Sequence, residues 1–166
     1  MLFRSADFEA DLAKPLRGRN FEKGRQAFVD GQCLACHRFG IEGGGVGPDL
    51  TAVSARFSRR DVLESILDPS KVVSEQFQNT TVWLKNGNDH TGRLVEETPE
   101  KLVLVPNQLQ PDQRVEVRKG DISQRAFSKV CPMPGGLADS LSKDDILDLV
   151  AFLESAGRKS HPAFAK

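Results

Sequence analysis

The spacing of apolar residues predicts three helices. The first is expected over residues 21–30 and the second over residues 59–67, and the third follows Ser142 toward the C-terminus. In the third, Ile146 and Leu149 begin a series of apolar residues at i, i+3, i+4 and i+7, which places them on one helix face. The residues that cap or end these helices are Asn20, Gly31, Ser58, Asp68, Ser142 and Gly157.

Between the second and third helices the pattern changes to short runs rich in Val, Thr and Leu. Asn86-Gly87 separates two such runs and favours the tight turn that joins antiparallel strands. The strands are expected at residues 77–84, 91–97, 101–105, 114–117 and 121–126. Together they predict a small antiparallel sheet or barrel.

We therefore expect one helical domain that is interrupted by a β insert. A chain of 166 residues is long enough for a domain that carries a second, smaller one. The predicted fold class is mainly α with an inserted antiparallel β subdomain, α+β overall. The expected division is residues 1–20 as a linker or N-terminal extension, 21–75 and 127–157 as the helical domain, 76–126 as the β subdomain and 158–166 as a tail.

Composition excludes several classes of protein. Lys+Arg and Asp+Glu both number 23, so the formal net charge is zero, whereas a general nucleic-acid binder needs a basic excess. No apolar run approaches the roughly 18 to 20 residues that a membrane-spanning helix requires. The 3 cysteines are too few for a disulfide scaffold.

The sequence Cys33-Leu34-Ala35-Cys36-His37 is the feature that carries chemistry. Cys-x-x-Cys-His is the attachment signature of a c-type haem. Two thiols three positions apart can form thioethers with the two vinyl groups of one porphyrin, and the adjacent His37 then donates a ring nitrogen to the iron. The motif predicts one covalently bound haem c, held by Cys33 and Cys36, with His37 as the proximal ligand.

Two other kinds of site also use paired cysteines. A zinc site needs about four ligands, and Cys131, His90 and His161 provide no second paired motif. A thioredoxin-type pair needs a strand before it and a helix that begins at its first cysteine. Here a predicted helix precedes the motif and glycine-rich sequence follows it, so the pattern favours haem.

Met133 is the candidate for the second axial ligand of the iron. The chain has 2 methionines, and Met1 is its first residue. Prolines on both sides of Met133 stiffen the loop, so its thioether can be held against iron at a small cost in entropy. Packing in the core is the alternative role of Met133. Cys131 remains a competitor, either as a thiolate ligand or as a buried thiol.

The segment Gly47-Pro48 indicates how His37 would be oriented. A metal-bound histidine usually donates its other ring N–H to a carbonyl or carboxylate group. We expect the Pro48 carbonyl, which follows a glycine-rich stretch, to be the acceptor. An ordinary Gly-Pro turn is the alternative.

These residues resemble a class I cytochrome c. In that family a helix ends at Cys-x-x-Cys-His, a Gly-Pro-x-Leu segment follows, and a Met-Pro loop precedes a C-terminal helix that crosses the first one. Gly24 and Phe28, against Val150, Phe152 and Leu153, are the matching positions at that crossing. The resemblance implies a class I cytochrome c helical fold, here with the β insert.

Longer strings resemble one subfamily in particular. Residues 46–51, 61–71 and 133–137 are similar to the haem-binding domain of multidomain proteins of planctomycete and verrucomicrobial type. Such domains often lie at the C-terminal end of a polypeptide with a sugar-dehydrogenase-like propeller. The resemblance covers about residues 21–157, and it implies a dehydrogenase protein or fused dehydrogenase domain as the redox partner.

The expected function is electron transfer. With His37 and Met133 on the iron, no coordination position is open to a substrate, so no enzyme activity is expected of this chain. Electrons would pass from a dehydrogenase domain or protein to a downstream carrier. The alternative is a haem-based sensor or binding module whose β insert recognises protein or polysaccharide. A peroxidase-like enzyme would need a distal His, Arg or Glu that the sequence does not identify.

The haem also implies a compartment. Attachment to Cys-x-x-Cys-His takes place in the periplasm or an equivalent exported compartment. Residues 1–7 lack the long apolar core of a secretory signal, so we expect an excised domain or a mature segment. The sequence leaves the electron donor and acceptor, the redox potential and the oligomeric state open.

Overall fold

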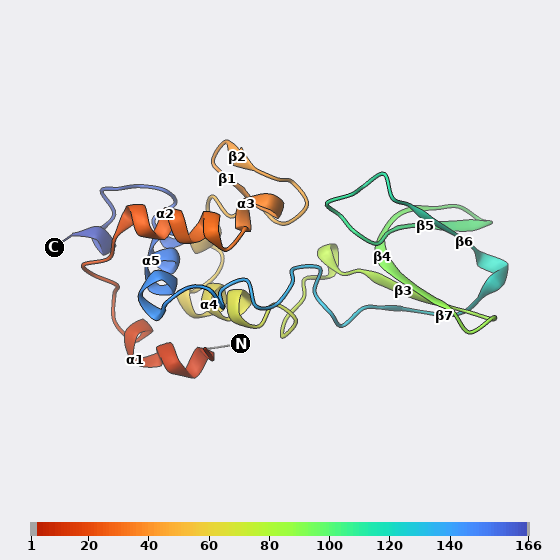
Figure 1. Ribbon diagram of the computed structural model, residues 1–166, viewed down its shortest axis with the longest axis horizontal. Coiled ribbons are helices and arrows are strands. Elements are labelled where there is room, and N and C mark those ends of the chain that lie inside the picture. Colours follow the sequence, from red (N-terminus) through yellow and green to blue (C-terminus); the bar gives the residue numbers. More distant parts are fainter. Residues whose placement is uncertain (1–2, 166) are drawn as a thin grey trace. The chain divides into compact units, whose positions relative to one another are not determined.

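The computed structural model describes residues 3–165, so Met1 lies outside the described residues. The chain is folded into two compact units (Figure 1). The second unit is Val72–Met133, and the first unit is formed by the residues before and after that segment. No helix in the described part of the chain is long and apolar enough to cross a membrane.

The three predicted helices of the first unit are confirmed, together with their N-caps, although the third ends at Glu154 with Ser155 as its C-cap rather than at Gly157. The side chain of Asn20 accepts the backbone N–H of Lys23, and Ser58 and Ser142 each form a capping box with an aspartate three residues later. The elements of this unit are η1 (Ser5–Phe8), α1 (Glu9–Leu12), α2 (Phe21–Asp30), α3 (Cys33–Cys36), β1 (Arg38–Phe39), β2 (Glu42–Gly43), η2 (Val53–Ala55), α4 (Arg59–Leu67), α5 (Lys143–Glu154) and η5 (Pro162–Phe164).

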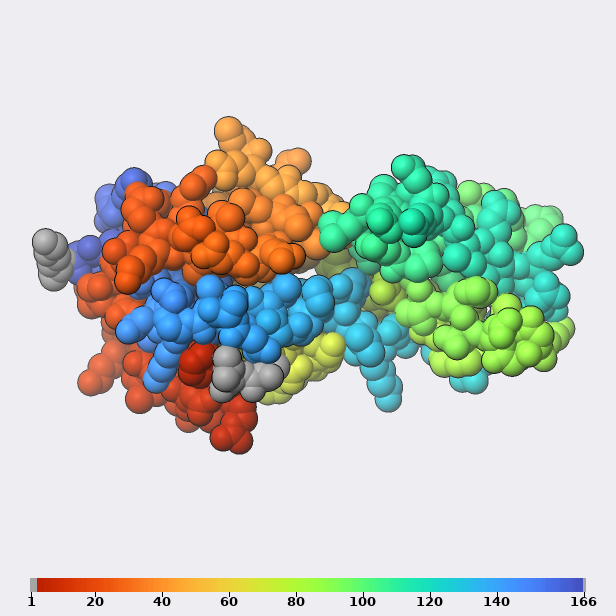
Figure 2. Space-filling view, viewed as in Figure 1, coloured from red at the N-terminus to blue at the C-terminus, as the bar shows by residue number. Residues whose placement is uncertain are grey.

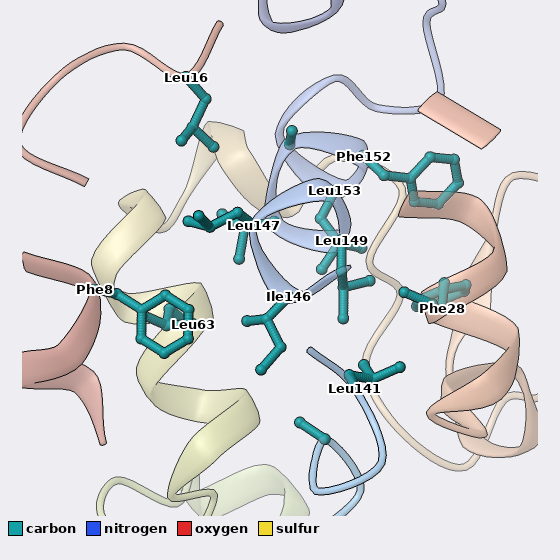
Figure 3. Close-up of a cluster of buried hydrophobic side chains, with 14 of the residues drawn as sticks. Phe8, Leu16, Phe28, Leu63, Leu141, Ile146, Leu147, Leu149, Phe152 and Leu153 are labelled. Atoms are coloured by element: carbon teal, nitrogen blue, oxygen red, sulfur yellow. The ribbon is translucent and has the colours of Figure 1, made fainter. Parts of the chain in front are cut away.

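Helix α5 is the central element of the first unit. Its residues from Ile146 to Leu153 are buried, so this helix has partners on more than one side. Ile146 points toward the side on which Phe8 and Leu63 lie, whereas Phe152 points toward Phe28 of α2 (Figure 3). In the space-filling view, the orange segment around α2 and the blue segment leading into α5 lie against each other (Figure 2).

The approach of α2 to α5 requires a glycine. A Cβ atom on Gly24 would lie 2.3 Å from the carbonyl oxygen of Asp148 and 2.8 Å from the Cβ of Phe152. Next to this contact, the rings of Phe28 and Phe152 pack with their centroids 5.9 Å apart. Of the matching positions named from the resemblance, Gly24, Phe28 and Phe152 therefore meet.

Within the described residues, segments near both ends of the chain pack on the core, unlike the expected linker and tail. Phe8 is 0% exposed, and Leu16 is also buried in the cluster around α5. Near the C-terminus, Ala163 is buried, and the ring of Phe164 contacts that of Phe21 at a centroid distance of 5.3 Å. Residues 1–20 mix polar and apolar positions without a clear period, so the sequence pattern did not identify Phe8 and Leu16 as core residues.

The second unit is a five-stranded antiparallel sheet in the order β6-β5-β4-β3-β7. Val82, Leu102, Leu104 and Val117 form its core, separate from that of the first unit. One residue inserted in β7 shifts the register between Trp83 and Leu84. The elements are η3 (Glu75–Phe77), β3 (Thr80–Leu84), β4 (Asp89–Glu97), β5 (Lys101–Val105), β6 (Val115–Arg118), η4 (Lys119–Asp121) and β7 (Ile122–Phe127).

The expected fold class, a mainly α class I cytochrome c fold, is wrong. The chain is 34% helical and 20% strand, and it contains the five-stranded sheet. The resemblance rests on the helices and loops around the Cys-x-x-Cys-His motif. Those helices are short, and the strands between α4 and α5 form a unit with its own core, so neither class of element dominates the chain.

The α2–α5 contact yields a first prediction. Gly24→Ala places a Cβ against the backbone of Asp148, so the free energy of unfolding of the haem-loaded protein should fall by about 3 kcal/mol. Urea unfolding measures this loss. Gly45→Ala is the matched control, because a Cβ there meets nothing within 4 Å. Equal stability of the two variants would contradict the close contact.

A second prediction concerns pH. Burial raises the pKa of the Asp148 carboxyl, although the Asn20 N–H at 3.0 Å and Arg19 at 3.6 Å oppose the shift. The folded state then holds the proton more tightly, so stability should fall as pH rises from the unfolded pKa of about 3.9 through the raised folded pKa. Asp148→Asn keeps the acceptor and should remove this slope in urea unfolding between about pH 4 and 7. An unchanged slope in Asp148→Asn would contradict the raised pKa of Asp148.

Candidate functional site

The Cys-x-x-Cys-His motif begins three residues after the end of helix α2. The helix is capped by Gly31, whose N–H donates to the carbonyl of Ala27 at 2.9 Å. The next residue, Gln32, has a φ of 56°, a left-handed conformation that turns the chain sharply. The one-turn helix α3 then begins at Cys33.

Helix α3 brings the two cysteines to the same side. Cys33 and Cys36 are three positions apart in one helical turn, and side chains at this spacing lie on one face. The N–H of His37 donates to the carbonyl of Cys33 at 2.9 Å and closes the turn. All three side chains are half-buried, so a planar group could cover them.

A glycine-rich loop wraps around this turn. The N–H of Gly47 donates to the carbonyl of Cys36 at 2.8 Å, and that of Gly44 donates to Leu34 at 2.9 Å. A Cβ on Gly47 would lie 2.8 Å from Cε1 of His37 and 3.2 Å from its Nε2. Only glycine therefore lets the loop lie directly against the imidazole.

The imidazole of His37 is oriented by Pro48. Its Nδ1 lies 2.8 Å from the Pro48 carbonyl oxygen, the atom proposed from the sequence as its acceptor. A carbonyl oxygen only accepts hydrogen bonds, so Nδ1 carries the proton and Nε2 keeps its lone pair. This is the arrangement that a metal-binding histidine needs.

The thiols suit thioether formation better than metal binding or redox exchange. Burial raises the pKa of Cys33 to about 11 and also raises the pKa of Cys36. Zinc sites and reactive thiols require a thiolate, which this environment disfavours. A thioether sulfur carries no charge, so burial does not penalise it. The residues present therefore fit covalent haem.

The other candidate residues belong to other elements of the chain. Met133 is half-buried in the loop after β7 and is the last residue of the second unit, so its role as an axial ligand stays a prediction. Cys131 also belongs to that unit, and His90 lies in β4. His161 caps η5 through Nδ1, which accepts the N–H of Ala163 at 3.3 Å.

Among the described residues, neither a metal cluster nor the cavity of the first unit offers another role for the cysteines or His37. Within residues 3–165, no three His, Cys, Asp or Glu side chains are grouped to hold a metal ion, and no disulfide joins the cysteines. A cavity of about 540 Å³ in the first unit is lined by Leu34, Phe28 and Phe39 among others, but not by Cys33 or His37. The expected attachment site is therefore not this cavity.

Sequence analysis missed the supporting role of the glycines. The sequence indicated only a glycine-rich stretch after the motif, whereas the structure has the hairpin β1–β2 there and packs Gly43, Gly44 and Gly47 against the motif. The run of glycines directly after a ligand motif was the available signal, because close backbone approach is a common reason for glycine.

Comparison with known families agrees with this geometry. The family model for cytochrome c matches residues 21–93, which include the motif, the glycine-rich loop and Pro48. No curated protein matches the chain. The family match supports a cytochrome c domain and implies covalently bound haem c as the cofactor.

The Gly47–His37 contact yields a third prediction. In the haem-loaded protein, Gly47→Ala should push the imidazole or the loop away and weaken the hydrogen bond from Nδ1 to Pro48. The Nδ1 proton, followed by NMR, should then exchange with water roughly tenfold faster. Gly45→Ala is the control in the same loop, and faster exchange in both variants would argue against a specific contact.

Proposed function

We propose that the chain is a one-electron carrier with one covalently bound haem, attached at Cys33 and Cys36. The observation that carries this proposal is the His37 imidazole, which donates Nδ1–H to Pro48 directly after a turn that presents both cysteines. The family match supports a haem-binding electron-transfer domain rather than a catalytic one. Haem c supplies an iron that accepts and releases single electrons.

The residues of the first unit have distinct roles in this proposal. Cys33 and Cys36 anchor the group through thioether bonds, and His37 provides Nε2 as the proximal ligand. Pro48 fixes the ring tautomer and orientation, and such a hydrogen bond also raises the basicity of the ligand. Gly47 keeps the ring from rotating by lying against it.

Met133 is the proposed second axial ligand. Its neighbours Pro132 and Pro134 restrict the backbone on both sides, and the side chain is half-buried rather than packed in a core. A thioether ligand favours the reduced iron and raises the potential. Filling both axial positions leaves none for substrate, which suits a carrier.

The proposed partners are a dehydrogenase domain or protein as the donor and a second carrier as the acceptor. The strings that resemble the planctomycete-type haem-binding domain support this donor. Many charges of the first unit already form ion pairs, such as Arg25 with Glu42 and Arg59 with Glu154, so docking would be weakly electrostatic. Haem attachment further supports an exported location, in the periplasm.

Met133→Ala tests the ligand set in protein matured with haem-attachment machinery. The variant should keep its haem through acid–organic extraction, lose the weak red sulfur-to-iron band of the ferric form and have a lower potential. Absorption spectra and redox titration measure these changes.

Cys131→Ser is the control for the test of Met133. It should keep both the red band and the wild-type potential. If the wild type lacks the band, or if Cys131→Ser changes the spectrum instead, Met133 is not the ligand. Loss of haem on extraction from the wild type would overturn the covalent attachment itself.

A further inference from the structure

The second unit carries the chain's single tryptophan on the face of its sheet that is turned away from the core. Trp83 lies in β3 next to Val82, and successive residues of a strand point to opposite faces. Val82 is 0% exposed in the core, whereas Trp83 is 37% exposed. Burial of the unit's core therefore does not explain why this position holds a large indole.

Polar side chains flank Trp83 on both neighbouring strands. The register places Asp89 of β4 and Gln124 of β7 directly opposite Trp83. Residues directly opposite in antiparallel strands lie side by side on the same face. Asp89 and Gln124 are exposed, so an aromatic surface lies between a carboxylate and an amide.

An irregularity of β7 sets this arrangement. The extra residue at Ser123 shifts the register directly after the Trp83–Gln124 pair. The hydroxyl of Ser123 donates to the carbonyl oxygen of Trp83 at 3.0 Å and fixes the local backbone. Such bulges re-aim side chains and are frequent next to functional sites.

The side chains next to the indole on this face are small, and most of them are polar. Two residues before Trp83 in β3, Thr81 lies opposite Thr91 of β4 and Ala126 of β7. The two threonine hydroxyls are 2.8 Å apart. None of these three side chains is large enough to rise above the sheet. These small side chains leave room directly beside the indole for an extended, hydroxyl-rich molecule.

We propose that this face of the second unit binds a neutral polysaccharide. A sugar ring has a flat face of C–H groups that can lie on the Trp83 indole, whose rigid apolar area is large. The hydroxyls at the ring's edge can donate to the Asp89 carboxylate and exchange hydrogen bonds with the Gln124 amide. The proposal is independent of electron transfer by the first unit.

Charge argues against an anionic partner. Residues 72–133 contain equal numbers of acidic and basic side chains, and a polyanion needs a basic excess. The cations Lys119 and Arg125 both pair with Glu97. The charged group directly beside the indole is the acidic Asp89, which would repel phosphate or carboxylate.

Affinity electrophoresis of the haem-loaded chain tests the proposal. Native gels containing β-glucan, xyloglucan or galactomannan should retard the wild type in at least one case, and polygalacturonate gels should not. Trp83→Ala should weaken the binding at least about tenfold. Asp89→Asn, which does not alter the apolar contact, should weaken it by a smaller factor.

Phe127→Ala is the matched control, since it removes another exposed aromatic ring, 64% exposed, from the same unit. It should be retarded like the wild type. No retardation in any neutral gel, equal retardation of Trp83→Ala, or binding of a proline-rich peptide in place of glycan would overturn the proposal. Haem absorption spectra of all variants should stay unchanged, which separates this result from a failure of electron transfer.

Discussion

The first unit depends on one close contact, in which the backbone of α2 at Gly24 lies against the backbone of α5 at Asp148. Because no side chain separates them there, Phe28 and Phe152 can pack beside the crossing. The buried carboxylate of Asp148 also accepts the N–H of Asn20, the residue that caps α2. The start and the middle of α2 are thus fixed to the same partner helix, and the direction in which α2 points is determined.

The position of the haem-attachment motif follows from that direction. Helix α2 ends at Gly31, and the turn at Gln32 leads immediately into the cysteines. Directly after the motif, Phe39 returns to the same aromatic cluster, with its ring centroid 4.7 Å from that of Phe152. The motif is therefore anchored to α5 on both sides, through α2 before it and through Phe39 after it. His37 is in turn held by Pro48, so its ring has little freedom.

Hydrogen bonds between residues close in the sequence were predictable, whereas packing between residues far apart in the sequence was not. Ser58 and Ser142 cap their helices through neighbours three residues away, so the sequence pattern alone identified them. Gly31 was expected to end α2, and it does, but the left-handed residue that turns the chain is the next one, Gln32, which no sequence pattern indicated. Phe8 is buried by residues far along the chain, which no local pattern indicates. The balance of helix and strand was missed although the strands themselves were expected, because the fold class was taken from the resemblance of the helices and loops around the motif.

Two separate cores explain how one chain combines these features. The β insert buries Val82 and Leu104 in its own cluster, so it interrupts the first unit between α4 and α5 without replacing any contact of α2 with α5. The chain passes between the units only before Val72 and after Met133. The proposed axial ligand is therefore at the point where the chain leaves the β insert, with a proline on each side. The two prolines restrict the backbone of this connection, so the position of Met133 in the loop is set locally rather than by the sheet's core.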